Sequence, residues 1–276
     1  MMLTEYSFWL VMVSLLCIGA ERLAPWRREQ TIIRPQIGQD LFWLLFNGFL
    51  AGIVFGGVLG FAERWLATGF SATFHVAPDS LRLLATWPLA VQILVVLVVA
   101  DLIEWLVHNA LHRCGPLWAI HRVHHSIVTM DWIGNFRFHW GEILLYKTVK
   151  YLPLALLGAR WEAILVTAVL STLIGNLNHA NLNISWGPLR YVLNSPRMHI
   201  WHHDKHPPTR AGVNFGVVFS LWDWLFGTAY MPRDAAQPEA LGYRGMERTP
   251  RALWMRFLLP GYDRGTVTSS MKRTVG

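Results

Sequence analysis

The chain has 276 residues, of which 24 are lysine or arginine and 17 are aspartate or glutamate, so only 15% of its side chains are charged. Apolar residues make up 53%, the mean hydropathy is +0.32 and the formal net charge is +7. Soluble domains carry about 25% charged residues, so this composition excludes a disordered chain and a small disulfide scaffold and disfavours a water-soluble globule. No basic run or recognition motif for nucleic acid occurs. The composition predicts an all-α, polytopic membrane protein.

Several apolar stretches approach or reach the roughly 20 helical residues that a bilayer core requires. The predicted spans are residues 6–20, 41–62 and 86–107, followed by a hairpin of 143–157 and 161–178. Thr4 and Glu5 stand where a signal peptide would carry basic residues, so the first stretch is interpreted as a retained span. Lys147 and Lys150 weaken the prediction for 143–157. We therefore expect four or five membrane-embedded helices.

The distribution of basic residues predicts the orientation of these spans. Residues 21–35 contain four arginines, whereas residues 63–85 contain two. Loops rich in Lys and Arg tend to remain in the cytoplasm. The N-terminus is then expected outside, and the ends of the spans near His108 and His179 are expected at the cytoplasmic face, together with every histidine cluster.

Histidines are concentrated in one part of the chain. Twelve are present, and eleven of them fall between His108 and His206. Three clusters have helical spacing: His108-x3-His112, His121-x2-His124-His125 and His199-x2-His202-His203. Residues three or four apart share a helix face, so each cluster is expected to point two or three imidazoles one way. Imidazole binds Fe, Zn, Cu or Ni, and eight clustered histidines plus His179 exceed the capacity of one ion, which predicts two metal ions in a helical histidine-rich cap.

These clusters resemble those of the fatty acid hydroxylase/sterol desaturase superfamily, whose members are integral-membrane di-iron oxygenases. The resemblance runs from Asp101 to Thr228 and is not specific for a substrate. Besides the clusters it includes Arg137-Phe138-His139-Trp140-Gly141-Glu142, similar to an R-x-H-P-x-E element, and Asn178-His179, Asn214-Phe215-Gly216 and Trp222-Asp223-Trp224-Leu225-Phe226-Gly227-Thr228. Trp140 stands where proline is usual.

The resemblance implies a centre of two iron ions, with zinc as a substitute in purified protein. The implied metal ligands are His108, His112, His121, His124, His125, His179, His199, His202 and His203. His139 is a further candidate, although a supporting role is favoured for it. Asp101 and Glu104 lie seven and four residues before His108 on the same helix face, and we expect them to hold ring N–H groups of the ligands. For Glu104, a position facing interfacial water is an equal alternative.

The implied activity is the hydroxylation or desaturation of an unactivated C–H bond of a lipid with O₂. No flavin, haem or iron–sulfur motif occurs, so electrons would come from an external donor such as a ferredoxin or a cytochrome b5-like protein. The expected organisation is a transmembrane region at 1–100, a di-metal hydroxylase domain at 101–230 that includes the hairpin 143–178, and a basic cytoplasmic tail at 231–276. We expect a multi-pass protein of a bacterial inner membrane.

One alternative is a histidine-rich metal- or haem-binding membrane protein or transporter without oxygenase activity. Transported ions need polar groups near the middle of the membrane, whereas these histidines are predicted at the ends of spans. The histidine pattern therefore favours the oxygenase.

Overall fold

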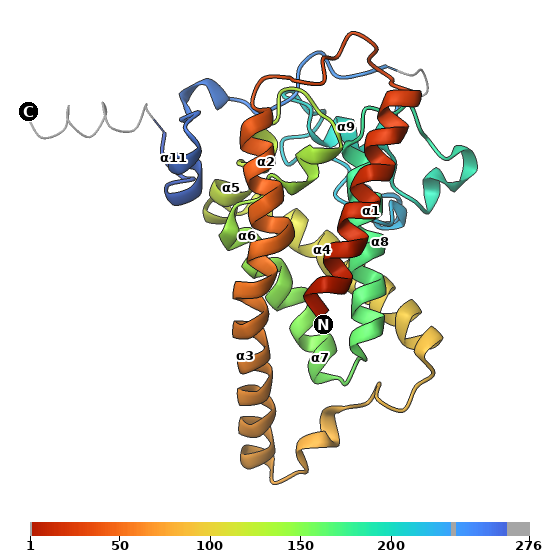
Figure 1. Cartoon of the computed structure of the whole chain (residues 1–276), viewed down its shortest axis with the longest axis vertical. Coiled ribbons are helices and arrows are strands. Elements are labelled where there is room, and N and C mark those ends of the chain that lie inside the picture. Colours follow the sequence, from red (N-terminus) through yellow and green to blue (C-terminus); the bar gives the residue numbers. More distant parts are fainter. Residues whose placement is uncertain (1, 233–235, 264–276) are drawn as a thin grey trace, which may run out of the picture.

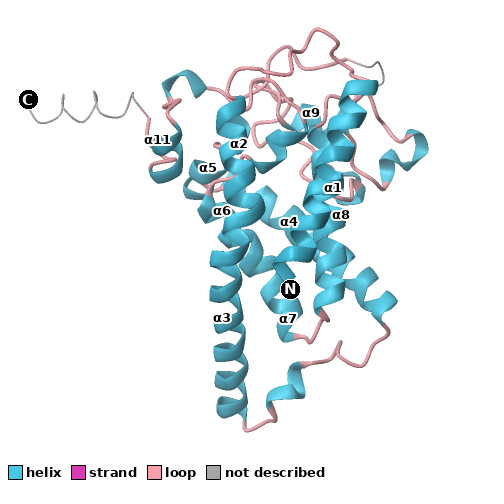
Figure 2. Ribbon diagram, in the orientation of Figure 1, coloured by secondary structure: helices cyan, strands magenta, loops and turns pink. Residues whose placement is uncertain are grey.

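The computed structural model describes residues 2–232 and 236–263. This part of the chain is helical, with three isolated β-bridges and no strand (Figure 2). Part of the predicted cytoplasmic tail, residues 233–235 and 264–276, lies outside the described residues. The α-helices are α1 (Met2–Leu23), α2 (Ile37–Leu45), α3 (Ala51–Phe74), α4 (Leu89–Arg113), α5 (Gly115–His121), α6 (Trp140–Tyr146), α7 (Leu152–Leu156), α8 (Trp161–His179), α9 (Pro196–His202), α10 (Leu221–Leu225) and α11 (Leu253–Leu258).

Short helices of other types connect these elements. Two are π-helical, η1 (Phe46–Leu50) and η5 (Lys147–Tyr151), and each joins two α-helices without a break. The 3₁₀ helices are η2 (Pro78–Leu81), η3 (His124–Ser126), η4 (Trp132–Phe136), η6 (Gly187–Tyr191) and η7 (Met246–Arg248).

In the described part of the chain, four helical segments are long and apolar enough to cross a membrane. They are Tyr6–Leu23, Ile37–Phe74, Leu89–Arg113 and Trp161–His179. These four contain or closely match four of the predicted spans, which confirms a polytopic helical protein. The fifth prediction, 143–157, falls on α6, η5 and α7, which are not among the candidate spans. Together they run only from residue 140 to 156, fewer than the roughly 20 residues that a bilayer core requires, and they carry Lys147 and Lys150.

The second span is a long rod. Residues 37–74 run through α2, η1 and α3, and 38 helical residues measure about 57 Å, well beyond the thickness of a bilayer core of about 30 Å. Figure 1 shows α3 extending to the end of the molecule opposite α9. Large apolar side chains such as Ile53, Val58 and Phe61 are exposed along it, as expected of a helix that faces lipid.

Two apolar cores hold the helices that carry the histidines. One core joins Leu10 and Val13 of α1 to Trp43 of α2 and Ile133 of η4. The other joins α4 and α8 through small side chains at their contact, including Ala100 and Ala163. Small residues allow close helix approach in a membrane, where lipid supplies no hydrophobic drive for association. The loops that follow these helices gather at the end of the molecule that holds α9 (Figures 1 and 2).

Candidate metal centre

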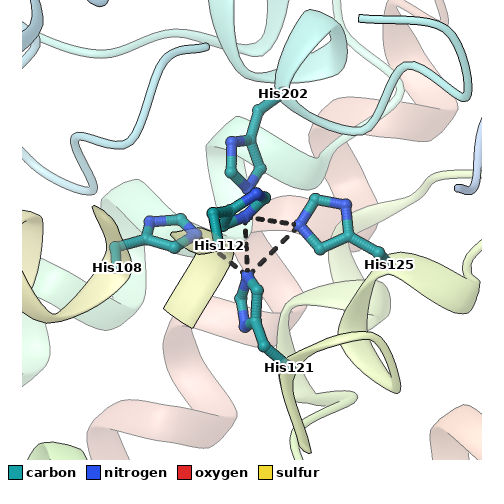
Figure 3. Close-up of side chains that lie close together, drawn as sticks. All are labelled: His108, His112, His121, His125 and His202. Carbon is teal, nitrogen blue, oxygen red and sulfur yellow. Dashed lines mark hydrogen bonds between the residues drawn. The ribbon is translucent and has the colours of Figure 1, made fainter. Parts of the chain in front are cut away.

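The nine predicted histidine ligands converge in two neighbouring groups. In each group, one ring nitrogen from every member lies within 4.8 Å of the others. All are buried except His112, which is half-buried. Figure 3 shows the first group, His108, His112, His121, His125 and His202; the second comprises His124, His179, His199 and His203.

The spacing within each cluster decides which group a histidine joins. Two histidines of the same cluster that are four residues apart belong to the same group in all three clusters. The i, i+4 pairs are His108 with His112, His121 with His125, and His199 with His203. The residue at i+3, His124 or His202, joins the other group. Successive helical residues differ by about 100° in direction, so the side chains at i+3 and i+4 point apart and can reach two neighbouring groups. Each cluster therefore points two imidazoles one way, within the two or three that the spacing predicts, and the third ring of the second and third clusters joins the other group.

Backbone carbonyls fix the protonation of three ligand rings, since a carbonyl oxygen can only accept a hydrogen bond. The Nδ1 atoms that donate are those of His108 to Phe215 (2.7 Å), of His179 to Gly175 (2.9 Å) and of His202 to Val213 (2.8 Å). A neutral imidazole has one N–H and one lone pair. The Nε2 atom of each of these rings therefore carries the lone pair, and it faces its group.

The Nε2 atoms approach one another as ligands of one cation do. Nε2 of His121 lies 3.1 Å from those of His108 and His112 and 3.2 Å from that of His125. One nitrogen has at most one proton, so it cannot hydrogen-bond to three others. Ligand nitrogens that lie about 2.1 Å from an ion and 90° apart are about 3.0 Å from one another. The donor set and its spacing thus fit a bound metal ion.

The second group shows the same pattern. Nε2 of His179 lies 3.2 Å from that of His124 and 3.3 Å from that of His199. Among the described residues, neither nitrogen of the buried His203 has a hydrogen-bond partner, and neither does Nε2 of His202 in the first group. Unpaired buried nitrogens are costly, and a cation in each group would satisfy them.

Burial keeps the ligand rings in the form that binds metal. It lowers the pKa of the six ligand histidines outside the candidate spans, and repulsion from neighbouring rings lowers it further. They are His121, His124, His125, His199, His202 and His203. These imidazoles are therefore neutral at pH 7, with lone pairs available to a metal.

Glu142 is the carboxylate that holds a ligand ring. Its Oε1 accepts a hydrogen bond of 2.7 Å from Nδ1 of His121, and its side chain is fully buried. Burial, together with the like charge of Glu104, raises the pKa of Glu142 well above its ordinary value. A cation bound to His121 would favour the ionised carboxylate and so strengthen this contact. Its place in the R-x-H-x-x-E element was the sequence signal for this role.

The predicted roles of Asp101 and Glu104 are wrong, because neither carboxylate contacts a histidine ring. Asp101 accepts hydrogen bonds from the backbone N–H groups of Val218 (2.8 Å) and Phe219 (3.0 Å). Glu104 pairs with Lys150 of η5 at 2.6 Å. The elements that pack against α4 supply the partners of these carboxylates: backbone N–H groups for Asp101 and the ammonium of Lys150 for Glu104. Asp101 instead anchors the loop whose Phe215 carbonyl orients His108.

His139 lies outside both groups. Its Nε2 donates to the carbonyl of Phe257 (2.9 Å), and its Nδ1 accepts from the N–H of Gly141 (3.0 Å) at the start of α6. Both ring nitrogens are therefore occupied, which leaves no lone pair for a metal.

A buried ion network that the sequence prediction missed ties α2 to the second cluster. The guanidinium of Arg137 binds both carboxylate oxygens of Asp40, at 2.5 and 2.8 Å, and donates to the carbonyl of Ser126 at 3.0 Å. Ser126 follows His125 directly. Arg34 bridges Asp40 to Asp131. A charged residue in an apolar segment, here Asp40, was the available signal.

A cavity of about 600 Å³ opens onto the centre. It reaches His108 of the first group and three members of the second, His124, His179 and His199. Its walls come from η1 and α3, from α6 and η5, and from α8. A volume of this size accepts a small organic molecule or part of a lipid.

The chain is similar to known lipid-modifying enzymes. Residues 93–228, which contain all nine histidines, match the family model described as fatty acid hydroxylase. An ornithine lipid hydroxylase of Rhizobium tropici is 34% identical over 57% of this chain and 46% of its own length. An alkylglycerol monooxygenase of Caenorhabditis elegans is 26% identical over 57% of this chain and 30% of its own. A very-long-chain aldehyde decarbonylase of rice is 26% identical over 56% of this chain and 52% of its own length.

The matches therefore cover about half the length of these relatives or less. No solved structure matches the chain. The family match and the histidine pattern agree with the resemblance seen in the sequence, and they place the chain in the fatty acid hydroxylase/sterol desaturase superfamily.

Proposed function

We propose that the protein is a membrane-bound di-iron oxygenase that hydroxylates an unactivated C–H bond of a lipid. The observation that carries this proposal is the meeting of two groups of convergent imidazoles with one elongated cavity between membrane-spanning helices. The names of the relatives, which include a lipid hydroxylase and a monooxygenase, support the same class of reaction.

The nine histidines would hold two iron ions, five at one ion and four at the other. Iron supplies the redox chemistry with O₂ that zinc lacks. The protein orients the rings through Glu142 and the backbone carbonyls, and keeps them neutral by burial. The apolar part of the cavity excludes water and holds the alkyl chain, and three of the four members of the second group line the same cavity.

Electrons would come from an external donor such as a ferredoxin or cytochrome b5-like protein. His112, the half-buried ligand, is the member of the centre closest to solvent. It lies at the end of α4, and the following residues Arg113 and Cys114 are exposed. We propose this edge, at the cytoplasmic face, as the point where electrons enter.

The test is a lipid extract incubated with iron-loaded protein, a reductant system and ¹⁸O₂. We expect a lipid product heavier by one labelled oxygen, and no label when the same reaction is run in H₂¹⁸O. Label from water would indicate hydration or hydrolysis and would reject the oxygenase. Protein loaded with zinc is the matched control and should give no product. A transporter, or a metal- or haem-binding protein without oxygenase activity, would give no labelled lipid product from ¹⁸O₂.

A further inference from the structure

The cavity changes character along α8. Residues of α8 that line it recur every three or four positions and so form one face of the helix: Trp161, Ile164, Leu165, Ala168, Ser171, Thr172, Gly175, Asn178 and His179. The first four are apolar, and the next four are polar or small. From Trp161 to His179 the helix rises about 27 Å. The cavity is therefore long, with an apolar far end and a polar end at the metal centre.

Two side-chain carbonyls at the polar end have no hydrogen-bond partner among the described residues. Asn178 is 1% exposed, its Nδ2 donates to the carbonyl of Val217 (2.8 Å), and its Oδ1 is unpaired. Asn47 donates from Nδ2 to the carbonyls of Phe136 and Phe138, at 2.8 Å each, and its Oδ1 is also unpaired. These donations fix both amides, so a flip of the amide would leave the carbonyls without donors. Each Oδ1 is therefore a hydrogen-bond acceptor without a donor among the described residues.

A buried ion pair stands at the same end. Glu104 and Lys150 line the cavity, with side chains 14% and 6% exposed, and Glu104 precedes His108 by one turn of α4. Ionisable side chains within a membrane protein generally mark a substrate or ion pathway. Lys150 and Asn47 both lie in π-helical segments, which are frequent at functional sites because the wider turn changes the direction of side chains.

We infer that the cavity binds an amphiphile with its polar group at the metal centre, where Asn47 and Asn178 accept hydrogen bonds from an amide N–H or hydroxyl of the substrate. The alkyl chain then extends along α8 toward Trp161. This inference rests on the proposed function, and it specifies the position of attack. Oxidation falls on a carbon within a few bonds of the polar group, rather than in the middle or at the end of the alkyl chain. A plain alkyl chain threaded past the metals would leave both acceptors unpaired.

Binding measured without turnover tests this subsite. The probes are N-methylpalmitamide, which has one N–H, and N,N-dimethylpalmitamide and methyl palmitate, which have none. Affinities for the purified protein in nanodiscs are measured by displacement of a fluorescent fatty acyl probe. We expect the secondary amide to bind about tenfold or more tightly than the other two, since only it has an N–H to donate to one of the buried acceptors. Equal affinities would overturn the inference.

Variants assign the preference to a residue. Asn47→Leu and Asn178→Leu should each reduce the preference for the secondary amide, and the double replacement should bring the three affinities to near equality. Ile164→Ala, in the apolar part of the cavity, is the matched control and should weaken all three ligands alike. Metal content and unfolding temperature are measured on each preparation. If Asn47→Leu fails to fold, the comparison of the three ligands on the wild type decides the question.

The position of the oxygen is the second readout. If the protein oxidises lipids, fragmentation mass spectrometry should place the new oxygen on carbons near the amide or hydroxyl. Oxygen in the middle or at the end of the chain would overturn the inference and leave the oxygenase intact. Selective binding of the secondary amide without any oxidation would reject the oxygenase and leave the subsite intact.

Discussion

At the scale of single residues, His121 occupies the central place in the first group. Its Nε2 lies within 3.2 Å of three other ligand nitrogens, and its Nδ1 is held by Glu142. A carboxylate behind a ligand imidazole orients the ring and increases the donor strength of the other nitrogen. It also compensates part of the charge of a metal ion that is surrounded by neutral rings. Glu142 is therefore expected to set the metal affinity of the first group through His121.

Replacing Glu142 by glutamine should weaken metal binding while keeping the shape of the site. The glutamine carbonyl can still accept from His121, but the negative charge is lost, and losses of this kind are about 10–100-fold in metal affinity or activity. Metal retention against a chelator series measures the effect. Glu104→Gln is the matched control and should retain metal as the wild type does, because Glu104 contacts Lys150 rather than a ring. Wild-type retention in Glu142→Gln would contradict this role.

Single histidine replacements should separate the two groups. His125→Ala removes a ligand of the first group and His124→Ala removes one of the second, although the two residues are adjacent in the chain. Each variant should bind about one ion fewer than wild type by elemental analysis after anaerobic iron loading, and each should lose turnover. His75→Ala, at the end of α3 that is remote from the centre, should keep both ions and activity near wild type. Wild-type metal content at or below one ion per chain would reject a two-ion centre.

At the scale of elements, the ligands lie where helices end. His179 closes α8, His121 closes α5, and the second cluster continues into η3, so the rings depend on how the following loops are anchored. Arg137 supplies one such anchor, because it joins Asp40 of α2 to the backbone beside His125. The ion network thereby fixes the loop of the second cluster relative to a membrane-spanning helix.

Arg137→Met should destabilise the fold. Removal of one partner from a buried ion pair costs about 3–5 kcal/mol, and because Arg34 still faces Asp40 we expect about 3 kcal/mol. Urea unfolding in detergent, followed by tryptophan fluorescence, measures the loss. Arg160→Met is the matched control, because Arg160 pairs with Glu162 on the surface, where such pairs contribute little. Equal stability of the two variants would show that the network does not hold the loop.

The sequence was sufficient to predict features that depend on residues close together in the chain. Hydropathy located four of the five predicted spans, because a bilayer demands long apolar runs. Histidine spacing identified eight of the nine converging rings, and the family resemblance supplied His179. The sequence failed where the cause is a tertiary contact. Asp101 and Glu104 share a helix face with His108, but their carboxylate oxygens bind groups of other elements: backbone N–H groups for Asp101 and Lys150 for Glu104. The contact of Glu142 with His121 depends on how α5 and α6 pack, which no spacing in the chain encodes.

At the scale of the whole molecule, the protein is divided along the membrane normal. The loops that follow α1, α8 and α9 gather at one end of the molecule, and α3 with the loop after it reaches the other (Figure 1). Residues 21–35, which precede α2 on the side of the centre, contain four arginines, whereas 63–85 at the far end contain two. By the positive-inside tendency, the end with the metal centre is expected to face the cytoplasm.

Cysteine labelling in intact bacterial cells tests this orientation, and the chain offers a suitable native residue. Cys114 is exposed beside the centre, and the only other cysteine, Cys17, is buried. A membrane-impermeant maleimide should leave Cys114 unlabelled until the cells are opened. A new cysteine at the exposed Ala77, just beyond α3, in a Cys114→Ser background should react from outside. Labelling of both positions from the same side would reject the predicted topology, and labelling of Cys114 alone from outside would reverse it.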